Sequence, residues 1–204
     1  MNPHSITSAL AALFLVSSTN TATAVTIDFE NLSDLSPVNS TYTAQGVLVQ
    51  NAISLTAGVS LNEFDFPPSS GSIVIGDDVI NDGDPMIITF LHSSDSVSAF
   101  FSYASTLTFT AFDPFGTLLG EFSTATSSML GLSEQIIVPY NGLGSLHIAG
   151  SEANSFTMDD LSFEPNLPAS LPDGGSTLGL LGITLLSLLP ATWRSHRPIR
   201  PRHE

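Results

Sequence analysis

The feature that most constrains the fold is an alternation of apolar and polar residues in short runs. From residue 25 to residue 165, clusters of Gly, Pro, Asn, Asp and Ser separate these runs at intervals of roughly ten residues, and helical periodicity is missing. In the first run, Val25, Ile27 and Phe29 alternate with polar residues. Alternation of this kind puts one face of a strand in a core and the other in water.

Short strands without helices favour an all-β fold. We expect an antiparallel two-sheet sandwich, jelly-roll-like, because no helical crossover is visible between the runs. The runs predicted as strands are Val25–Glu30, Gly46–Gln50, Ile53–Thr56, Ser72–Ile75, Met86–Leu91, Ser96–Tyr103, Leu107–Phe112, Thr117–Phe122, Glu134–Val138, Leu143–Ala149 and Phe156–Phe163.

Charge is distributed very unevenly along the chain. The 204 residues include 19 acidic and only 4 basic side chains, for a formal net charge of −15. There is no lysine, and the four arginines all follow residue 193. The rest of the chain therefore lacks the basic surface that nucleic acids and other polyanions require. Cysteine is absent, which excludes disulfides and thiolate chemistry.

The N-terminal segment 1–24 is predicted to be a secretory signal peptide. Ala9–Val16 is a short apolar run, and Ala22-Thr23-Ala24 forms an A-x-A cleavage signature, with Ala22 and Ala24 as its small residues. The alternative is a buried N-terminal strand or helix. Export would place residues 25–165, the predicted β domain, outside the cytoplasm.

The C-terminal segment has three parts. Residues 166–177 form a Pro- and Gly-rich linker that ends in the motif Leu171, Pro172, Asp173, Gly174, Gly175, Ser176, Thr177. Residues 178–193 are predicted as a short hydrophobic helix, and residues 194–204 are a basic tail. Sixteen helical residues reach only about 24 Å, against a bilayer core of about 30 Å. The arginines would stay cytoplasmic and hold the domain at the inner membrane.

This combination of motif, short apolar helix and terminal arginines resembles the PEP-CTERM sorting signals, in particular the VPDSG type. Leu171 stands where valine is usual, and Gly174 takes the serine position. The resemblance covers Leu171–Glu204 and implies recognition by an exosortase-type membrane protease. It also implies export and a cell-surface or extracellular location, with only transient anchoring in the membrane. The alternative is an ordinary single-span anchor.

The middle of the chain also resembles β-sandwich modules of exported PEP-CTERM proteins. The matching pieces are Ile27–Glu30, Tyr42 with Gln45–Val47, Ala111–Gly116 and Met158–Phe163. This resemblance implies a jelly-roll fold without a defined catalytic activity.

The alternation breaks at Asp159 and Asp160, which predicts a β-bulge beside two carboxylates. Asp28 and Glu30 would join them if the first and last strands pair. Clustered oxygen ligands suit Ca²⁺, so these four residues are the predicted structural calcium site, and a solvated acidic edge is the alternative. A second acidic cluster, residues 77–84, is explained by turn chemistry, with metal binding as the alternative.

No catalytic motif is present, so we predict a structural or adhesive protein of the cell surface or extracellular matrix and not an enzyme. A carbohydrate-binding module for a neutral glycan or exopolysaccharide is the alternative, and a polysaccharide hydrolase is a remote one. The aromatic side chains considered for sugar binding are Tyr42, Tyr103, Tyr140, Phe64 and Phe66.

Overall fold

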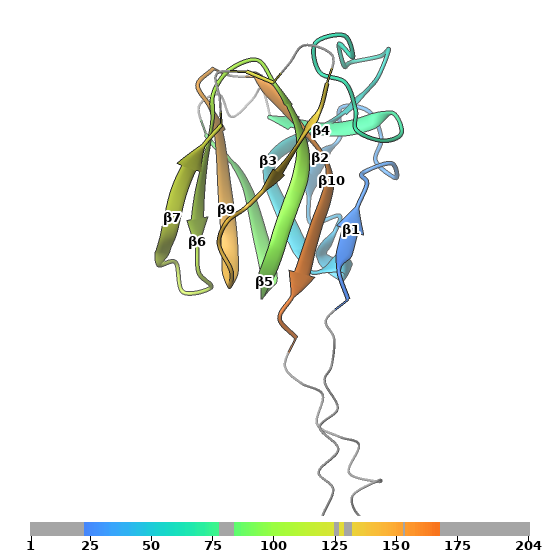
Figure 1. Cartoon of the computed structure of the whole chain (residues 1–204). Helices are drawn as coiled ribbons and strands as arrows, with labels where there is room; N and C mark the ends of the chain where they lie inside the picture. Colours follow the sequence, from blue (N-terminus) through green and yellow to red (C-terminus); the bar gives the residue numbers. More distant parts are fainter. Residues whose placement is uncertain (1–22, 78–83, 125–126, 129–131, 153, 168–204) are drawn as a thin grey trace, which may run out of the picture. The chain divides into compact units, whose positions relative to one another are not determined.

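The computed structural model describes residues 23–77, 84–124, 127–128, 132–152 and 154–167 (Figure 1). These residues form ten strands and one short 3₁₀ helix, Thr43–Gln45. The strands are β1 (Val25–Ile27), β2 (Pro37–Asn39), β3 (Val47–Thr56), β4 (Ile73–Asp77), β5 (Met86–Tyr103), β6 (Leu107–Phe112), β7 (Leu118–Ser123), β8 (Glu134–Ile137), β9 (Leu143–Gly150) and β10 (Phe156–Pro165).

All pairings between these strands are antiparallel, which confirms the predicted all-β class. The main path runs β1-β10-β4-β3-β5-β9-β6-β7, with β2 beside β3 and β8 beside β5. Hydrogen bonds thus join the ten strands in one sheet, and two separate sheets are not seen. The reason is that β5 changes partners along its length, from β3 and β9 near Ile88 to β10 and β8 near Phe101.

Two pairs of predicted strands are in fact single strands. Gly46–Gln50 and Ile53–Thr56 were expected to be separate, but apart from Gly46 both lie in β3, with Asn51 in the left-handed region at φ 57°. Met86–Leu91 and Ser96–Tyr103 likewise merge into β5, where Ser96 has φ 51°. Residues that usually form turns here bend a continuing strand instead. The sequence analysis did not predict β2.

The core contains the apolar side chains that the alternation placed there. Val97, Ala99, Phe101 and Tyr103 of β5 are all at most 4% exposed. Phe101 packs edge-on against Phe109 of β6, with ring centroids 5.3 Å apart. Side chains from different parts of the continuous sheet therefore fill one core.

The two ends of the β domain lie side by side. Val25 of β1 pairs with Phe163 of β10, as was expected for the first and last strands (Figure 1). The predicted cleavage residue Ala24 is exposed just before β1. Ala22, the sorting motif, the hydrophobic helix and the basic tail lie outside the described residues. Within the described part of the chain, no helix is long and apolar enough to cross a membrane.

Candidate functional site

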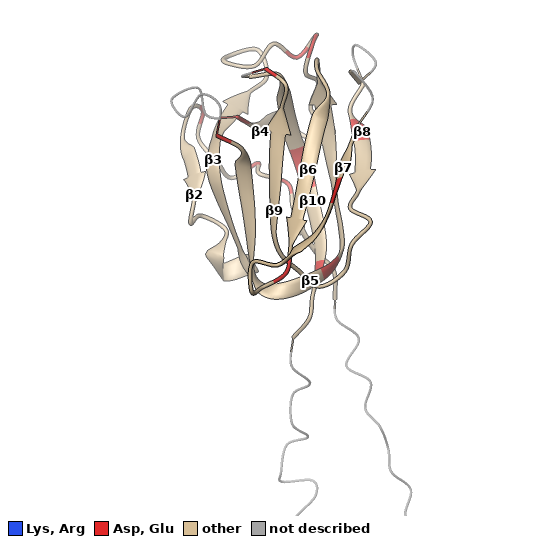
Figure 2. Cartoon of the chain, turned by 90° about the vertical axis from the view of Figure 1, so that its left-hand side faces the viewer, with Lys and Arg blue, Asp and Glu red and all other residues tan. Residues whose placement is uncertain are grey.

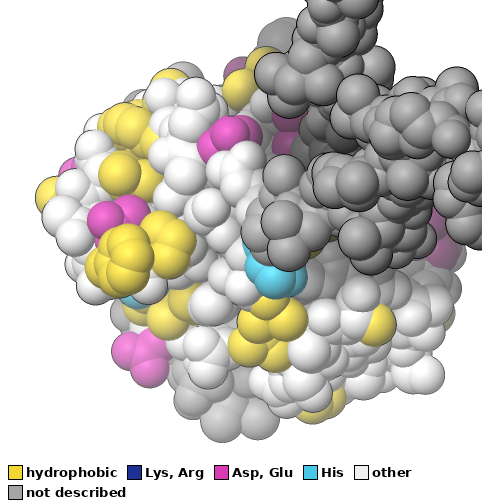
Figure 3. Space-filling view, turned by 90° about the horizontal axis from the view of Figure 1, so that it is seen from below, with side chains coloured by type: hydrophobic (Ala, Val, Ile, Leu, Met, Phe, Trp, Pro, Cys, Tyr) yellow, Lys and Arg dark blue, Asp and Glu magenta, His cyan; other side chains and the backbone are white. Residues whose placement is uncertain are grey.

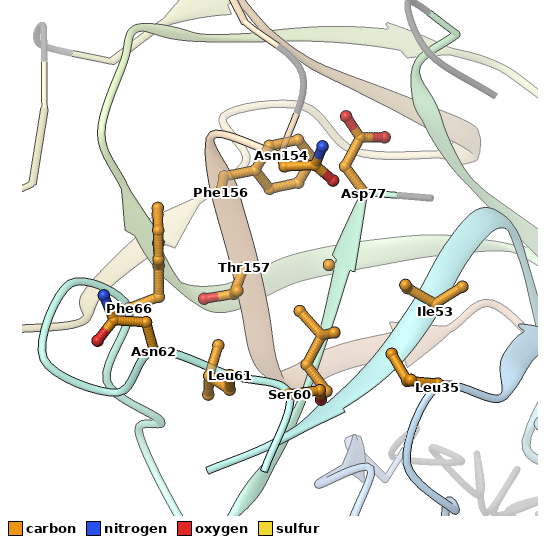
Figure 4. A pocket seen from close by; sticks show the side chains of 12 residues that line it. Leu35, Ile53, Ser60, Leu61, Asn62, Phe66, Asp77, Asn154, Phe156 and Thr157 are labelled. Carbon is orange, nitrogen blue, oxygen red and sulfur yellow. The ribbon is translucent and has the colours of Figure 1, made fainter. Parts of the chain in front are cut away.

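A cleft of about 320 Å³ opens between β3, β4, β10 and the segment that follows β3 (Figure 4). The lining residues that come from the three strands are Ile53, Leu55, Gly76, Asp77, Phe156 and Thr157. The remaining lining residues are Leu35, Ser60, Leu61, Asn62, Phe66 and Asn154. The volume falls at the lower end of the range of small-ligand pockets, about 300–1,000 Å³.

The cleft combines an apolar surface with a few polar groups. Figure 4 shows Phe66 and Asn62 on one side, with Asp77 and Asn154 on another side. The amide of Asn154 offers both hydrogen-bond donors and acceptors. The Asn62 amide already donates to Asp65 and accepts the Phe64 N–H, which leaves it one further donor and one further acceptor position. An apolar surface with a few such groups suits a small polar ligand that also has an apolar face.

Phe64 and Phe66 behave differently although they belong to one short segment. Phe64 is 81% exposed, whereas Phe66 is half-buried and lines the cleft. The backbone N–H of Phe66 donates to the carbonyl of Asn62 at 2.9 Å, which turns this segment back on itself. Of the two phenylalanines, Phe66 is therefore the one placed to contact a ligand in the cleft.

The buried carboxylate of Asp159 holds Ser69 and Ser70, which follow the cleft residue Phe66 in the sequence. Its Oδ2 accepts hydrogen bonds from the backbone N–H groups of Ser69 and Ser70, each at 2.9 Å. Asp159 is only 2% exposed, and this burial raises its pKa to about 6. The nearby Asp160 carboxylate adds to the rise, while hydrogen bonds from the backbone N–H groups of Ser70, Asp160 and Ser69 oppose it.

Two more carboxylates bind the connection between β3 and β4. Glu30 Oε1 accepts the N–H groups of Ser72 and Ile73, at 2.8 and 2.7 Å. Asp34 Oδ1 accepts the Thr56 N–H at 2.9 Å and the Ser60 hydroxyl, and this Ser60 bond is the main reason that the pKa of Asp34 lies below its usual range. Carboxylates thus hold both ends of the connection between β3 and β4, and this connection supplies Ser60, Asn62 and Phe66 to the cleft.

The bulge predicted near Asp159 is confirmed. The register between β10 and β5 shifts between Asp159 and Ser162, and Asp160 has φ 48°. The extra residue keeps Met158 and Leu161 in the core, where both are fully buried. Asp160 Oδ1 accepts the hydroxyl of Ser70 at 2.8 Å.

The structure brings three of the four predicted calcium ligands to one segment of chain. Glu30, Asp159 and Asp160 all bond to residues 70–73 or their neighbour Ser69, while Asp28 Oδ1 accepts the Glu30 N–H at 3.3 Å. Among the described residues, no group of three His, Cys, Asp or Glu side chains is arranged to hold a metal ion. Calcium at Asp28, Glu30, Asp159 and Asp160 stays a prediction.

Two of the tyrosines considered for sugar binding belong to the core. Tyr42 and Tyr103 are each 3% exposed. The Tyr42 hydroxyl donates to Asn31 and the Tyr103 hydroxyl donates to Glu134. The amphipathic character of tyrosine permits this burial when its hydroxyl finds a partner. These two side chains are therefore not platforms for a ligand.

The described surface carries acidic but no basic side chains (Figure 2). Seen from the end where β1 begins and β10 ends, hydrophobic side chains lie in separate patches beside acidic ones (Figure 3). A surface of this charge repels anionic ligands, so neutral or cationic ligands are the ones compatible with it.

No protein-family model and no curated protein matches the chain. Among solved structures, a DUF4465 family protein from Bacteroides caccae is similar, with 15% identity over 71% of this chain and 100% of that chain, and a TM-score of 0.46. Modules of an endo-1,4-β-D-xylanase from Clostridium thermocellum, solved with xylohexaose, share 16% identity over 71% of this chain and 30% of that chain, with a TM-score of 0.37. Both likenesses are too low to carry a functional argument.

Proposed function

We propose that residues 25–165 form an adhesive surface module that binds a neutral glycan in the cleft beside Phe66. The observation that carries this proposal is the combination of an apolar cleft surface with the side chains of Asn62, Asp77 and Asn154. Sugars present both hydroxyl groups and apolar C–H faces, so such a surface matches them chemically. The mechanism is non-covalent binding, and no catalytic residue is assigned.

The charge of the module supports a neutral ligand. Seventeen acidic residues and no lysine or arginine lie between residues 25 and 165. An anionic polysaccharide would therefore approach a surface of its own sign. Neutral glycans and the neutral part of an exopolysaccharide are the expected ligands.

We further propose that the module is exported and then sorted at its C-terminal end. The first strand begins at Val25, directly after the predicted cleavage residue Ala24, so removal of residues 1–24 leaves the sheet complete. An exosortase-type protease is the proposed partner at Leu171–Thr177. In this proposal the continuous sheet is folded into a jelly-roll-like sandwich, and the module lies at the cell surface.

Structural calcium at Asp28, Glu30, Asp159 and Asp160 is a separate part of the proposal. The support is that carboxylates gather here in a domain without basic side chains to neutralise them. Thermal unfolding of the full chain in Ca²⁺ and in chelator tests it. A higher midpoint in Ca²⁺, absent in Glu30→Gln, is expected; equal midpoints would remove the ion from the account.

Binding to an array of neutral glycans tests the ligand class. The full chain is expected to bind, Phe66→Ala to lose binding, and Phe64→Ala to keep it, because only Phe66 lines the cleft. Incubation with the bound glycan distinguishes binding from hydrolysis. Intact glycan is the expected result, and cleavage would favour a hydrolase.

A further inference from the structure

A second hollow, a groove of about 500 Å³, lies over β3, β5 and β9. It shares no lining residue with the cleft. Gln50 of β3 pairs with Ile87 of β5, which in turn pairs with His147 of β9. One row of three neighbouring strands thus presents these side chains across the groove. Thr89 and Ser145 form the next row inside the same lining.

Apart from the Asp113 carboxylate, the side chains that line the groove are uncharged, and its polar ones can bond hydroxyl groups. Gln50 is exposed and carries an amide that both donates and accepts. Burial lowers the pKa of His147, so its imidazole is neutral at pH 7 and offers one donor and one acceptor. The His147 ring lies against Phe112 of β6, with centroids 4.8 Å apart. This contact fixes the imidazole at the edge of the groove.

A rigid turn forms the wall at the other end of the groove. Asp113 Oδ1 accepts the N–H groups of Phe115 and Thr117, both at 2.8 Å, which fixes the turn between β6 and β7. A Cβ on Gly144 would lie 2.4 Å from the Pro114 backbone, so the turn packs directly on β9. The wall depends on this close approach.

We propose that this groove is a second binding site, which takes an internal stretch of a neutral polysaccharide chain. Gln50, Thr89, Ser145 and His147 would bond its hydroxyl groups, and the exposed Leu91 and Pro114 would contact its C–H faces. The groove has a larger volume than the cleft, about 500 Å³ against about 320 Å³, which favours a passing chain over a chain end. Together the two sites would let one module hold a polymer at two points.

Affinity electrophoresis of the full chain in soluble xylan, glucomannan and hydroxyethyl cellulose tests the groove. The double variant Gln50→Ala/His147→Ala is expected to raise the Kd for the polysaccharide about tenfold or more, because two or more hydrogen bonds are lost. Gln50→Ala alone, at an exposed position, is expected to show part of this loss without affecting the fold. Thr26→Ala, at the exposed position of β1, is the matched control and should bind as the wild type does.

The groove and the cleft fail in different ways. Polysaccharide binding that is unchanged in both Gln50 variants would overturn the second site. If short oligosaccharides still require Phe66 in that case, the cleft proposal stands. If the Gln50 variants lose polysaccharide binding and Phe66→Ala binds all glycans as the wild type does, the groove proposal is supported and the cleft proposal is overturned.

Discussion

Asp159 Oδ2 lies 2.9 Å from the backbone nitrogen of Ser70 and accepts its N–H. The bond joins two segments that are 89 residues apart in sequence. It ties the strand that closes the β domain to the chain leaving the cleft wall. A carboxylate buried to this degree needs such donors, because an unpaired charge in the interior is costly.

Removal of the Asp159 carboxylate is expected to destabilise the protein. Asp159→Ala leaves the Ser69 and Ser70 N–H groups without their acceptor, which costs about 2–4 kcal/mol of unfolding free energy. Urea unfolding of the full chain measures the change. Ser162→Ala, half-buried on the same strand, is the control and should alter stability far less. Equal stability of Asp159→Ala and the wild type would show that the segment does not depend on this anchor.

The raised pKa of Asp159 gives stability a definite pH dependence. Its pKa is about 6 in the folded protein against an ordinary 3.8, so folding favours the protonated form. The stability contributed by this group is present below pH 3.8 and is lost as the pH rises through 6. The loss is about 3 kcal/mol at most.

Urea unfolding between pH 4 and pH 7 measures this effect as the difference between wild type and Asp159→Asn. The wild type is expected to lose stability relative to the variant as the pH rises. Asp34 and Asp113, whose pKa values are lowered mainly by hydrogen bonds from Ser60 and Thr117, act in the opposite direction but only below about pH 4. Parallel curves for the two proteins would contradict the raised pKa.

Sequence reasoning predicted the strands better than their connections. The alternation from Val97 to Tyr103 follows directly from which face of a strand is buried. The continuity of β3 and β5 was missed, because the residues between the predicted strands, such as Asn51 and Asp95, resemble turn residues until their strands are seen to continue past them. The same ambiguity hid where each long strand changes partners.

The candidate site was only partly visible in the sequence. The break in alternation at Asp159 signalled an unusual position, but its backbone donors come from residues 89 and 90 positions away. No local pattern connects such distant segments. The cleft was missed because Ser60, Asn62 and Phe66 lie in an irregular segment without periodicity. The Phe64–Phe66 pair was the one signal that pointed to this region.

Gly71 and Gly58 allow a matched test of the Glu30 anchor. Both have positive φ, 53° and 73°, so alanine at either costs about 1 kcal/mol. A Cβ on Gly71 would also meet the Glu30 carboxylate, whereas a Cβ on Gly58 meets nothing within 4 Å. Gly71→Ala is therefore expected to destabilise by about 1 kcal/mol more than Gly58→Ala in urea unfolding. Equal losses would mean that Glu30 adjusts freely.

Processing at the N-terminus has a defined product. If Ala22-Thr23-Ala24 is a cleavage signature, the exported protein begins at Val25, the first residue of β1. Mass spectrometry of the secreted protein measures this end. Ala24→Leu is expected to block cleavage, because the signal requires small residues. An exported protein that retains residues 1–24 would contradict the prediction.

The most direct test of the cleft is isothermal titration of the full chain with neutral cello-, xylo- and manno-oligosaccharides. Saturable binding of at least one series is expected, weakened about tenfold or more by Phe66→Ala through the loss of an aromatic contact surface. Phe64→Ala, in the same segment but outside the cleft lining, is expected to bind as the wild type does. No binding by the wild type, or equal affinity in Phe66→Ala, would contradict the assignment of the cleft as a glycan site.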